Sequence, residues 1–115
     1  MTFEPFDVVV VPFPFTDRAA TKRRPALVLS SAPFNSAHDQ TILAMITSAT
    51  GHPWPSDVRL ANWQAAGLTV PCIVRLKLFT LDAVLIVRRI GAVSSHDADA
   101  VRATLRHALG DRPAD

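Results

Sequence analysis

Two short apolar runs flank the most basic segment of the chain and constrain what it can fold into. Val8–Val11 and Ala26–Leu29 consist of β-branched and other aliphatic residues, which favour extended backbone and predict two strands. Pro12 and Pro14 cannot donate a hydrogen bond to a neighbouring strand, so they predict the end of the first strand. Four cations and no acid lie between positions 18 and 24. The sequence therefore predicts a cationic loop between two strands of a sheet.

Short runs of strand length recur through the rest of the chain. They lie at residues 41–47, 58–60, 73–78 and 84–93. In the last run, Gly91 predicts a bulge or the close approach of another backbone segment. Ser31–Gln40 is rich in Ser, Asn and Asp, contains a proline, and predicts a loop. Short strands separated by turn signals at this spacing predict a small antiparallel barrel, closed or half-closed.

The C-terminal part of the chain has the residue spacing of a helix. Ser94 followed by Asp97 resembles a capping box, and Gly110 is suited to the C-terminal end of a helix. Apolar residues recur at helical spacing between them, at Ala98, Val101, Leu105, Ala108 and Leu109. This pattern predicts an amphipathic helix over about 95–109. A chain of 115 residues has room for one core, so we expect a single, mainly β domain over 1–115.

Composition excludes several classes of protein. The chain is 49% apolar and 19% charged, which is typical of a folded globular protein, and no run approaches the ~20 apolar residues of a membrane span. The first residues carry two acids and no basic region, so no secretory signal is expected. Cys72 is the single cysteine, which excludes a disulfide framework. We expect a soluble, cytoplasmic protein that needs no cofactor.

The motifs of common catalytic classes are absent from the sequence. Nothing resembles a P-loop, a dinucleotide-binding turn or a nucleophile elbow. The four histidines lack the spacing of metal ligands; they are His38, His52, His96 and His107. No metal site is therefore expected.

Cations and hydroxyls at predicted strand ends remain as candidates for a functional site. Cationic and hydroxyl donors suit a phosphodiester, and aromatic residues in loops suit unpaired bases. Arg75 and Lys77 alternate with apolar residues and should share one face of a strand, either as ligand contacts or as a solvated face. The candidate RNA-binding residues are Arg18, Lys22, Arg23, Ser48, Trp54, Arg75 and Lys77. Trp54 suits stacking and packing equally, whereas Trp63 is expected in the core or a dimer interface.

Three segments carry a resemblance to a known family. PFPFTD, KRRPALVLS and MITSAT closely resemble the PemK/MazF toxins of type II toxin-antitoxin systems, and the likeness extends to RIGAVS and the C-terminal helix. It implies an SH3-like barrel of the CcdB/MazF type that ends in a helix. It also implies a homodimer and a metal-independent endoribonuclease that cuts single-stranded RNA through the 2′-OH. The products would be a 2′,3′-cyclic phosphate and a 5′-OH, and an acidic antitoxin would be the cognate partner.

The resemblance also assigns roles to individual residues. The arginine of the Arg-Pro step and the threonine that closes the third strand act at the scissile phosphate in the family, and they match Arg24 and Thr47. An arginine of the family's VVRxD segment matches Arg75, but the acid of that segment is replaced here by Lys77. The general base is therefore open: Asp17 is the nearest acid in the first loop and the first candidate.

Two groups of alternatives remain open from the sequence. His52 is the second candidate for the general base, and both it and Asp17 also fit purely structural loop positions. For the whole chain, the alternatives to a nuclease are a non-catalytic DNA gyrase poison of the CcdB type and a degenerate family member that only binds RNA or antitoxin. The Arg-Pro step and Thr47 favour the nuclease.

Overall fold

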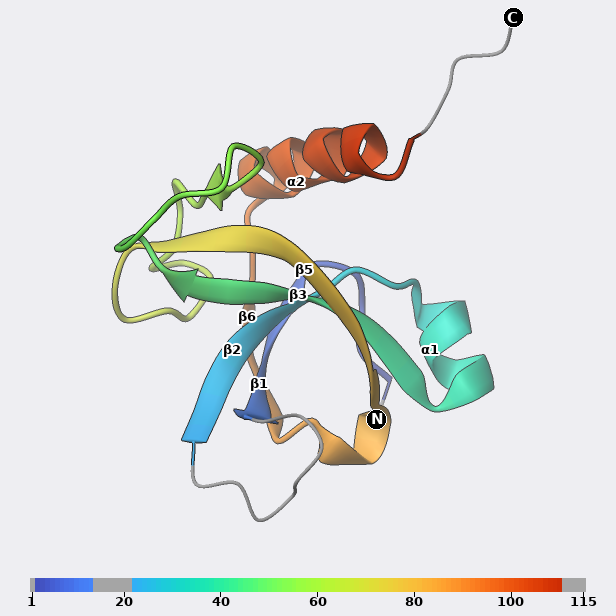
Figure 1. Cartoon of the computed structure of the whole chain (residues 1–115). Coiled ribbons are helices and arrows are strands. Elements are labelled where there is room, and N and C mark those ends of the chain that lie inside the picture. Colours follow the sequence, from blue (N-terminus) through green and yellow to red (C-terminus); the bar gives the residue numbers. More distant parts are fainter. Residues whose placement is uncertain (1, 14–21, 111–115) are drawn as a thin grey trace, which may run out of the picture.

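The computed structural model describes residues 2–13 and 22–110 and has one curled antiparallel sheet followed by a helix (Figure 1). The sheet has six strands in the order β4-β5-β3-β2-β1-β6. Their bounds are β1 Asp7–Phe13, β2 Lys22–Val28, β3 Gln40–Ser48, β4 Val58–Arg59, β5 Cys72–Asp82 and β6 Arg88–Ala92. The helical elements are α1 Ala32–His38, the 3₁₀ turn η1 Ala83–Leu85 and α2 Ser95–Ala108. The prediction of a mainly β, half-closed barrel with a C-terminal helix is confirmed.

The sheet has two buried faces, because successive residues of a strand project to opposite sides. We call one side the helix face; it packs against α2 and the segment 58–68. Its buried residues include Val8, Leu27, Ala44, Val74 and, from α2, Ala98 and Val101. The other side, the concave face, lines the inside of the curl and is buried at Phe3, Val9, Val11, Ala26, Leu43 and Leu81. In Figure 1, α2 lies across the outside of the sheet.

A bulge bends β5. Met45 of β3 pairs with Arg75, but the preceding residue Ala44 pairs with Leu78, so β5 has two additional residues between these pairs. Bulges bend a strand and increase its twist. The first part of β5 pairs with β4, and the part of β5 after the bulge curves downward in Figure 1.

A buried aspartate attaches the segment after β4 to α2. Both carboxylate oxygens of Asp97, which is 1% exposed, accept backbone N–H groups, from Ala61 at 2.9 Å and Asn62 at 2.9 Å. Ser94 is the N-cap and accepts the N–H of Asp97 at 3.2 Å. The predicted cap is therefore present, but the Asp97 carboxylate bonds to a distant segment.

Gly91 lies where two backbone segments touch. A Cβ on Gly91 would collide with the carbonyl of Ala66, and one on Gly67 would collide with the carbonyl of Ile90. Opposite Gly91, the register between β1 and β6 shifts at Val8. The predicted bulge and close backbone approach at Gly91 are both found.

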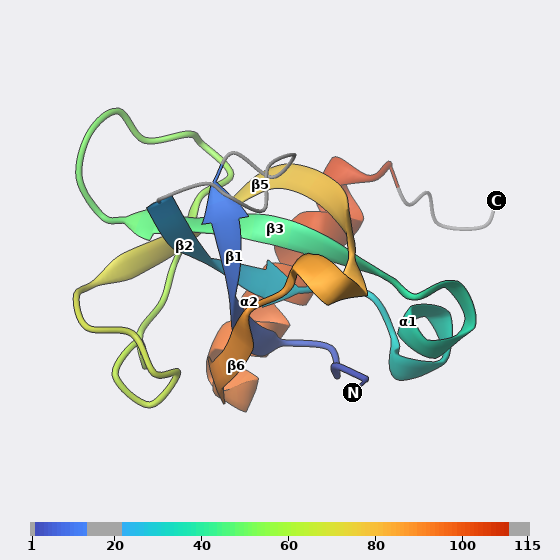
Figure 2. The same ribbon diagram turned by 90° about the horizontal axis from the view of Figure 1, so that it is seen from below.

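Three predictions about the bounds of elements are wrong. The expected loop at 31–40 contains the helix α1, whose N-cap Ser31 accepts the N–H of Phe34 at 3.3 Å. Ser and Pro favour the first positions of a helix as well as turns, and α1 is attached by Asn35, which is buried and donates to the carbonyls of Phe3 and Ser30. α1 lies outside the sheet, where β3 begins (Figure 2).

The other boundary errors concern prolines and strand ends. Pro12 does not end β1 but pairs opposite Arg23. Since the ladder to β6 ends at Val10, Pro12 has a neighbour on only one side, where a missing N–H is tolerated. The predicted strand at 84–93 is a 3₁₀ turn followed by β6, which begins only at Arg88.

Candidate functional site

The strand register places three candidate residues on one face of the sheet. Met45 pairs with Ala26 of β2 and with Arg75 of β5, and directly opposed residues project to the same side. Arg24 lies two residues before Ala26 and Thr47 two residues after Met45, so both project to that side as well. Arg24, Thr47 and Arg75 therefore surround Met45 on the concave face.

Arg24 and Thr47 lie on β2 and β3 beyond the end of the ladder that joins the two strands. The ladder between β2 and β3 ends at Ala26 and Met45, and beyond it the two strands diverge (Figure 1). Thr47 is half-buried and pairs with Ile73 of β5. The next residue, Ser48, is exposed, and its hydroxyl lies 3.0 Å from that of Thr50. Hydroxyl groups are thus carried by β3, and a guanidinium by β2, where the two strands no longer pair.

Arg24 is exposed on β2 and is held by an aromatic ring. Its guanidinium carbon lies 4.8 Å from the centroid of Phe13, and Val11 is its partner across the ladder. A cation over a ring face gains electrostatic attraction without giving up its hydrogen-bond donors. Phe13 thus orients Arg24 and leaves its N–H groups available to a ligand.

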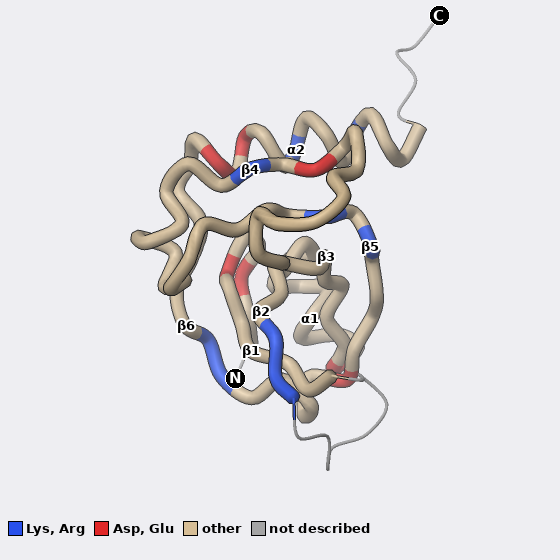
Figure 3. The backbone as a smooth tube through the Cα atoms, turned by 60° about the vertical axis from the view of Figure 1, so that its left-hand side comes forward, with Lys and Arg blue, Asp and Glu red and all other residues tan. Residues whose placement is uncertain are grey.

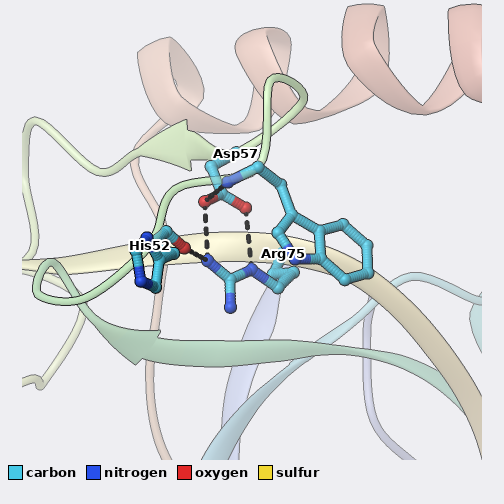
Figure 4. Close-up of polar contacts among 4 residues, drawn as sticks. His52, Asp57 and Arg75 are labelled. Carbon is cyan, nitrogen blue, oxygen red and sulfur yellow. Dashed lines mark hydrogen bonds and ion pairs between the residues drawn. The ribbon is translucent and has the colours of Figure 1, made fainter.

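Arg75 forms a bidentate ion pair that the sequence did not predict (Figure 4). Its Nε donates to Oδ1 of Asp57 at 3.0 Å, and its Nη2 donates to Oδ2 at 2.9 Å and to the carbonyl of His52 at 3.0 Å. The two side chains are 16% and 8% exposed. The hydrogen bond to Arg75 lowers the pKa of Asp57 below its ordinary value, and the pKa of Arg75 is raised by the same bond. Both groups are therefore charged.

The sequence contained a signal for Asp57. It is the only acid between Gln40 and Leu81, so a cation of this region that needs an acidic partner has few choices. Lys77 replaces the acid of the family's VVRxD segment, but Arg75 nevertheless has a carboxylate partner. That carboxylate comes from the loop before β4.

Trp54 lies beside this ion pair and contacts two cations. The guanidinium carbon of Arg75 lies 5.1 Å from the centroid of the Trp54 ring, and the Nζ of Lys77 lies 5.8 Å from it. Its backbone N–H donates to Oδ2 of Asp57 at 2.8 Å. Trp54 remains 39% exposed, whereas Trp63 packs against the core on the helix face. Arg75 and Lys77 share one side of β5, as their alternation predicted.

The loop around Trp54 encloses a cavity of about 270 Å³. Thr50, Asp57, Arg59 and Arg75 contribute polar groups to its wall. Lys22 and Arg23 are exposed at the start of β2. Asp17 and Arg18, the remaining candidates, lie outside the described residues.

The described part of the chain has neither a cluster of metal ligands nor a helix suited to a membrane. Within residues 2–13 and 22–110, no group of three or more His, Cys, Asp or Glu side chains is arranged to hold a metal ion. No helix in the same ranges is long and apolar enough to span a membrane.

Residues 4–109 match a protein family described as PemK-like, MazF-like toxin of type II toxin-antitoxin system. The chain belongs to this family. The match includes β1 through α2, and thus every candidate residue of the site. The resemblance noted in the sequence is thereby confirmed.

Solved structures of PemK/MazF toxins have the same fold. A MazE-MazF complex from Deinococcus radiodurans is 23% identical, with a TM-score of 0.74 over 96% of this chain and 97% of that one. An endoribonuclease in complex with its cognate antitoxin, from a mycobacterial species, is 17% identical, with a TM-score of 0.76 over 98% of each chain. The Mycobacterium tuberculosis toxin MazF-mt6 is 18% identical, with a TM-score of 0.73 over 90% and 95%. A search of curated protein sequences gave no significant match.

Proposed function

We propose that this PemK/MazF toxin is an endoribonuclease that cuts single-stranded RNA by intramolecular attack of the 2′-OH. The observation that carries the proposal is the common face of Arg24, Thr47 and Arg75 around Met45. Two guanidinium groups and a hydroxyl on the same face of three neighbouring strands match the donors that a phosphodiester needs as charge accumulates on it. Endoribonuclease activity in a structural relative of the same family supports the assignment.

The reaction is a transesterification within the RNA. The 2′-oxygen attacks the adjacent phosphorus as its proton passes to a base, and the bond from phosphorus to the 5′-oxygen breaks. The 5′-oxygen takes up a proton from the protonated base or from water, so that a 2′,3′-cyclic phosphate and a 5′-OH remain. The nucleophile belongs to the substrate, so the reaction needs no metal-bound water. Arg24 stabilises the charge of the pentavalent transition state and hydrogen-bonds the leaving oxygen, and the hydroxyl of Thr47 donates to a non-bridging oxygen.

The proton of the 2′-OH requires an acceptor. Arginine stays protonated in proteins, so Arg24 and Arg75 are excluded as bases. Asp57 is excluded as well, because Arg75 and the N–H of Trp54 occupy its oxygens. Asp17 is our first candidate and His52 the second, since the backbone of His52 is attached to Arg75.

The remaining candidates bind RNA on either side of the reacting phosphate. Arg75 uses Nε and Nη2 for Asp57 and His52, which leaves Nη1 to donate to the substrate. The exposed edge of Trp54 offers a stacking surface for a base. Phosphate contacts are assigned to Arg18, Lys22, Arg23, Ser48 and Lys77.

We infer a homodimer in the cytoplasm that is neutralised by an acidic antitoxin. The same acid-free cations that attract RNA phosphates attract carboxylates, so an antitoxin segment with interleaved acids and apolar residues would compete with substrate. Three of the related structures hold MazE together with MazF, which supports such a partner.

The decisive experiment is cleavage of a defined single-stranded RNA in EDTA, with the ends mapped. We expect cutting with 2′,3′-cyclic phosphate and 5′-OH ends, and a loss of about 10² or more in rate for Arg24→Ala, the scale of one preorganised donor. Arg106→Ala on α2 is the control for loss of a positive charge. Cleavage that disappears in EDTA, or an Arg24→Ala variant as fast as wild type, would contradict the mechanism. RNA binding without cleavage would identify a binding-only member.

A further inference from the structure

A second group of arginines lies around β1, outside the concave face. Val10 of β1 pairs with Arg88 of β6, and Pro12 of β1 pairs with Arg23 of β2. Opposed residues project to the same side of a sheet, and Val10 and Pro12 are two residues apart. Arg23 and Arg88 therefore project from the same face, one on each side of β1. Figure 3 shows the basic segments of β2 and β6 on the two sides of β1.

These arginines line a concave site that we call the arginine pocket. It has a volume of about 230 Å³, and its walls include Arg23, Arg24, Arg88, Thr69, Pro25 and Ile90. None of the described residues that line it is acidic. Arg23, Arg88 and the hydroxyl-bearing Thr69 thus line a partly apolar site, and no described lining residue offers a carboxylate to offset the charge. Arg24 lines the same site from β2, although its side chain projects to the concave face.

The charge of the pocket is not neutralised by the rest of the described chain. Arg89, the neighbour of Arg88, donates to Asp7 at 2.8 Å, and Arg75 is paired with Asp57. In residues 2–13 and 22–110, no ion pair involves Arg23, Arg24 or Arg88. Arg23 and Arg88, which have no ion-pair partner among the described residues, favour a bound anion at the site they line, and the planar forks of arginine suit the oxygens of a phosphate.

We propose that the arginine pocket binds a backbone phosphate of the RNA next to the one that is cut. This inference rests on the proposed function, because Arg24 connects the two sites: it lines the pocket and also belongs to the concave face. Successive residues of β2 project to opposite sides, so Arg23 and Arg24 present donors on both sides of the same strand. RNA bound at Arg24 and continuing past this rim would bring its next phosphates toward Arg23 and Arg88. That continuity favours RNA over an acidic peptide.

Binding of a single-stranded oligonucleotide with 2′-fluoro sugars tests the proposal, because such a strand lacks the attacking hydroxyl and cannot be cut. Fluorescence anisotropy should show an affinity about tenfold lower for Arg88→Gln than for wild type at low salt. The slope of log affinity against log salt should fall by about 0.7, the value for one lost phosphate contact on a single strand. Arg88→Lys should retain part of the affinity. Arg106→Gln on α2 is the matched control and should match wild type.

The outcomes separate the pocket from the catalytic site. If Arg88→Gln binds the oligonucleotide with unchanged affinity and salt slope while wild type cleaves RNA, the pocket proposal is overturned and the proposed function stands. If the variant keeps its RNA affinity but binds antitoxin more weakly, the pocket recognises an acidic peptide, which also overturns it. If the binding results are as expected but wild type does not cleave any RNA, the phosphate site stands and the nuclease assignment fails.

Discussion

At the scale of single residues, the pairing of Arg75 with Asp57 is the feature that most affects the proposed chemistry. A guanidinium fixed by two parallel hydrogen bonds loses little freedom when it meets a substrate. The backbone carbonyl of His52 and the ring of Trp54 fix it further. We therefore predict that Asp57 acts through Arg75 as a positioning residue.

Replacement of Asp57 tests this role. Asp57→Asn keeps the shape of the side chain but removes the charge that holds Arg75, so we expect single-turnover cleavage to slow about tenfold. Asp57→Glu should restore part of the rate, because a carboxylate is again available. The emission of Trp54 should change in the Asn variant if Arg75 leaves its ring. A variant with unchanged rate and unchanged emission would show that Asp57 does not position Arg75.

The same pair predicts a pH dependence of stability. The pKa of Asp57 is lowered in the folded state, chiefly by its hydrogen bond to Arg75. A lowered folded-state pKa means that the stabilisation is complete above the ordinary value of 3.8 and is lost as pH falls below it toward the folded-state value. The difference in urea midpoint between wild type and Asp57→Asn should therefore be constant near neutral pH and shrink below pH 3.8. A difference that grows on acidification would contradict this.

At the scale of secondary-structure elements, the contact between β6 and the segment 66–67 depends on glycine. Gly91→Ala should destabilise the protein by about 1–3 kcal/mol, because the added methyl meets a backbone carbonyl that cannot move aside easily. Gly110→Ala is a suitable comparison, since nothing lies within 4 Å of that site and only its positive φ of 71° is affected. Urea denaturation measures both. Equal stability of Gly91→Ala and wild type would refute the close contact.

Elements with a strong local pattern could be predicted from the sequence, and elements fixed by distant contacts could not. Thr41–Thr47 lies within β3, and the spacing of Ala98 and Val101 identified the buried side of α2. α1 was missed because its helix is completed by Asn35, whose amide reaches back to Phe3. The sequence alone does not show that contact.

The candidate site likewise contains residues that could be predicted from the sequence and one that could not. Arg24 and Thr47 were found through a family motif, and the register then placed them on one face. Asp57 was missed because it lies 18 residues from Arg75 and in a loop of irregular conformation. A partner across such a distance becomes apparent only when β5 and the loop are folded together.

At the scale of the whole molecule, apolar side chains remain at the surface of the protomer. The exposed large ones are Trp54, Val70, Leu78, Val84, Val87 and Leu109, with Val84 at 69% and Leu109 at 67%. Association of two protomers would remove part of this surface from water. Light scattering at micromolar concentration should give about twice 12.5 kDa. A mass of one protomer over the whole concentration range would contradict the dimer.

The bulge in β5 has a consequence for insertions and deletions. Arg75 before the bulge and Phe79 after it both project to the concave face, because the bulge contains an even number of additional residues. Deletion of both additional residues would leave the later side chains of β5 on their present faces. Deletion of one would move Phe79 away from the concave face and bring Thr80 to it. Length variants of this family at this position should therefore differ by even steps.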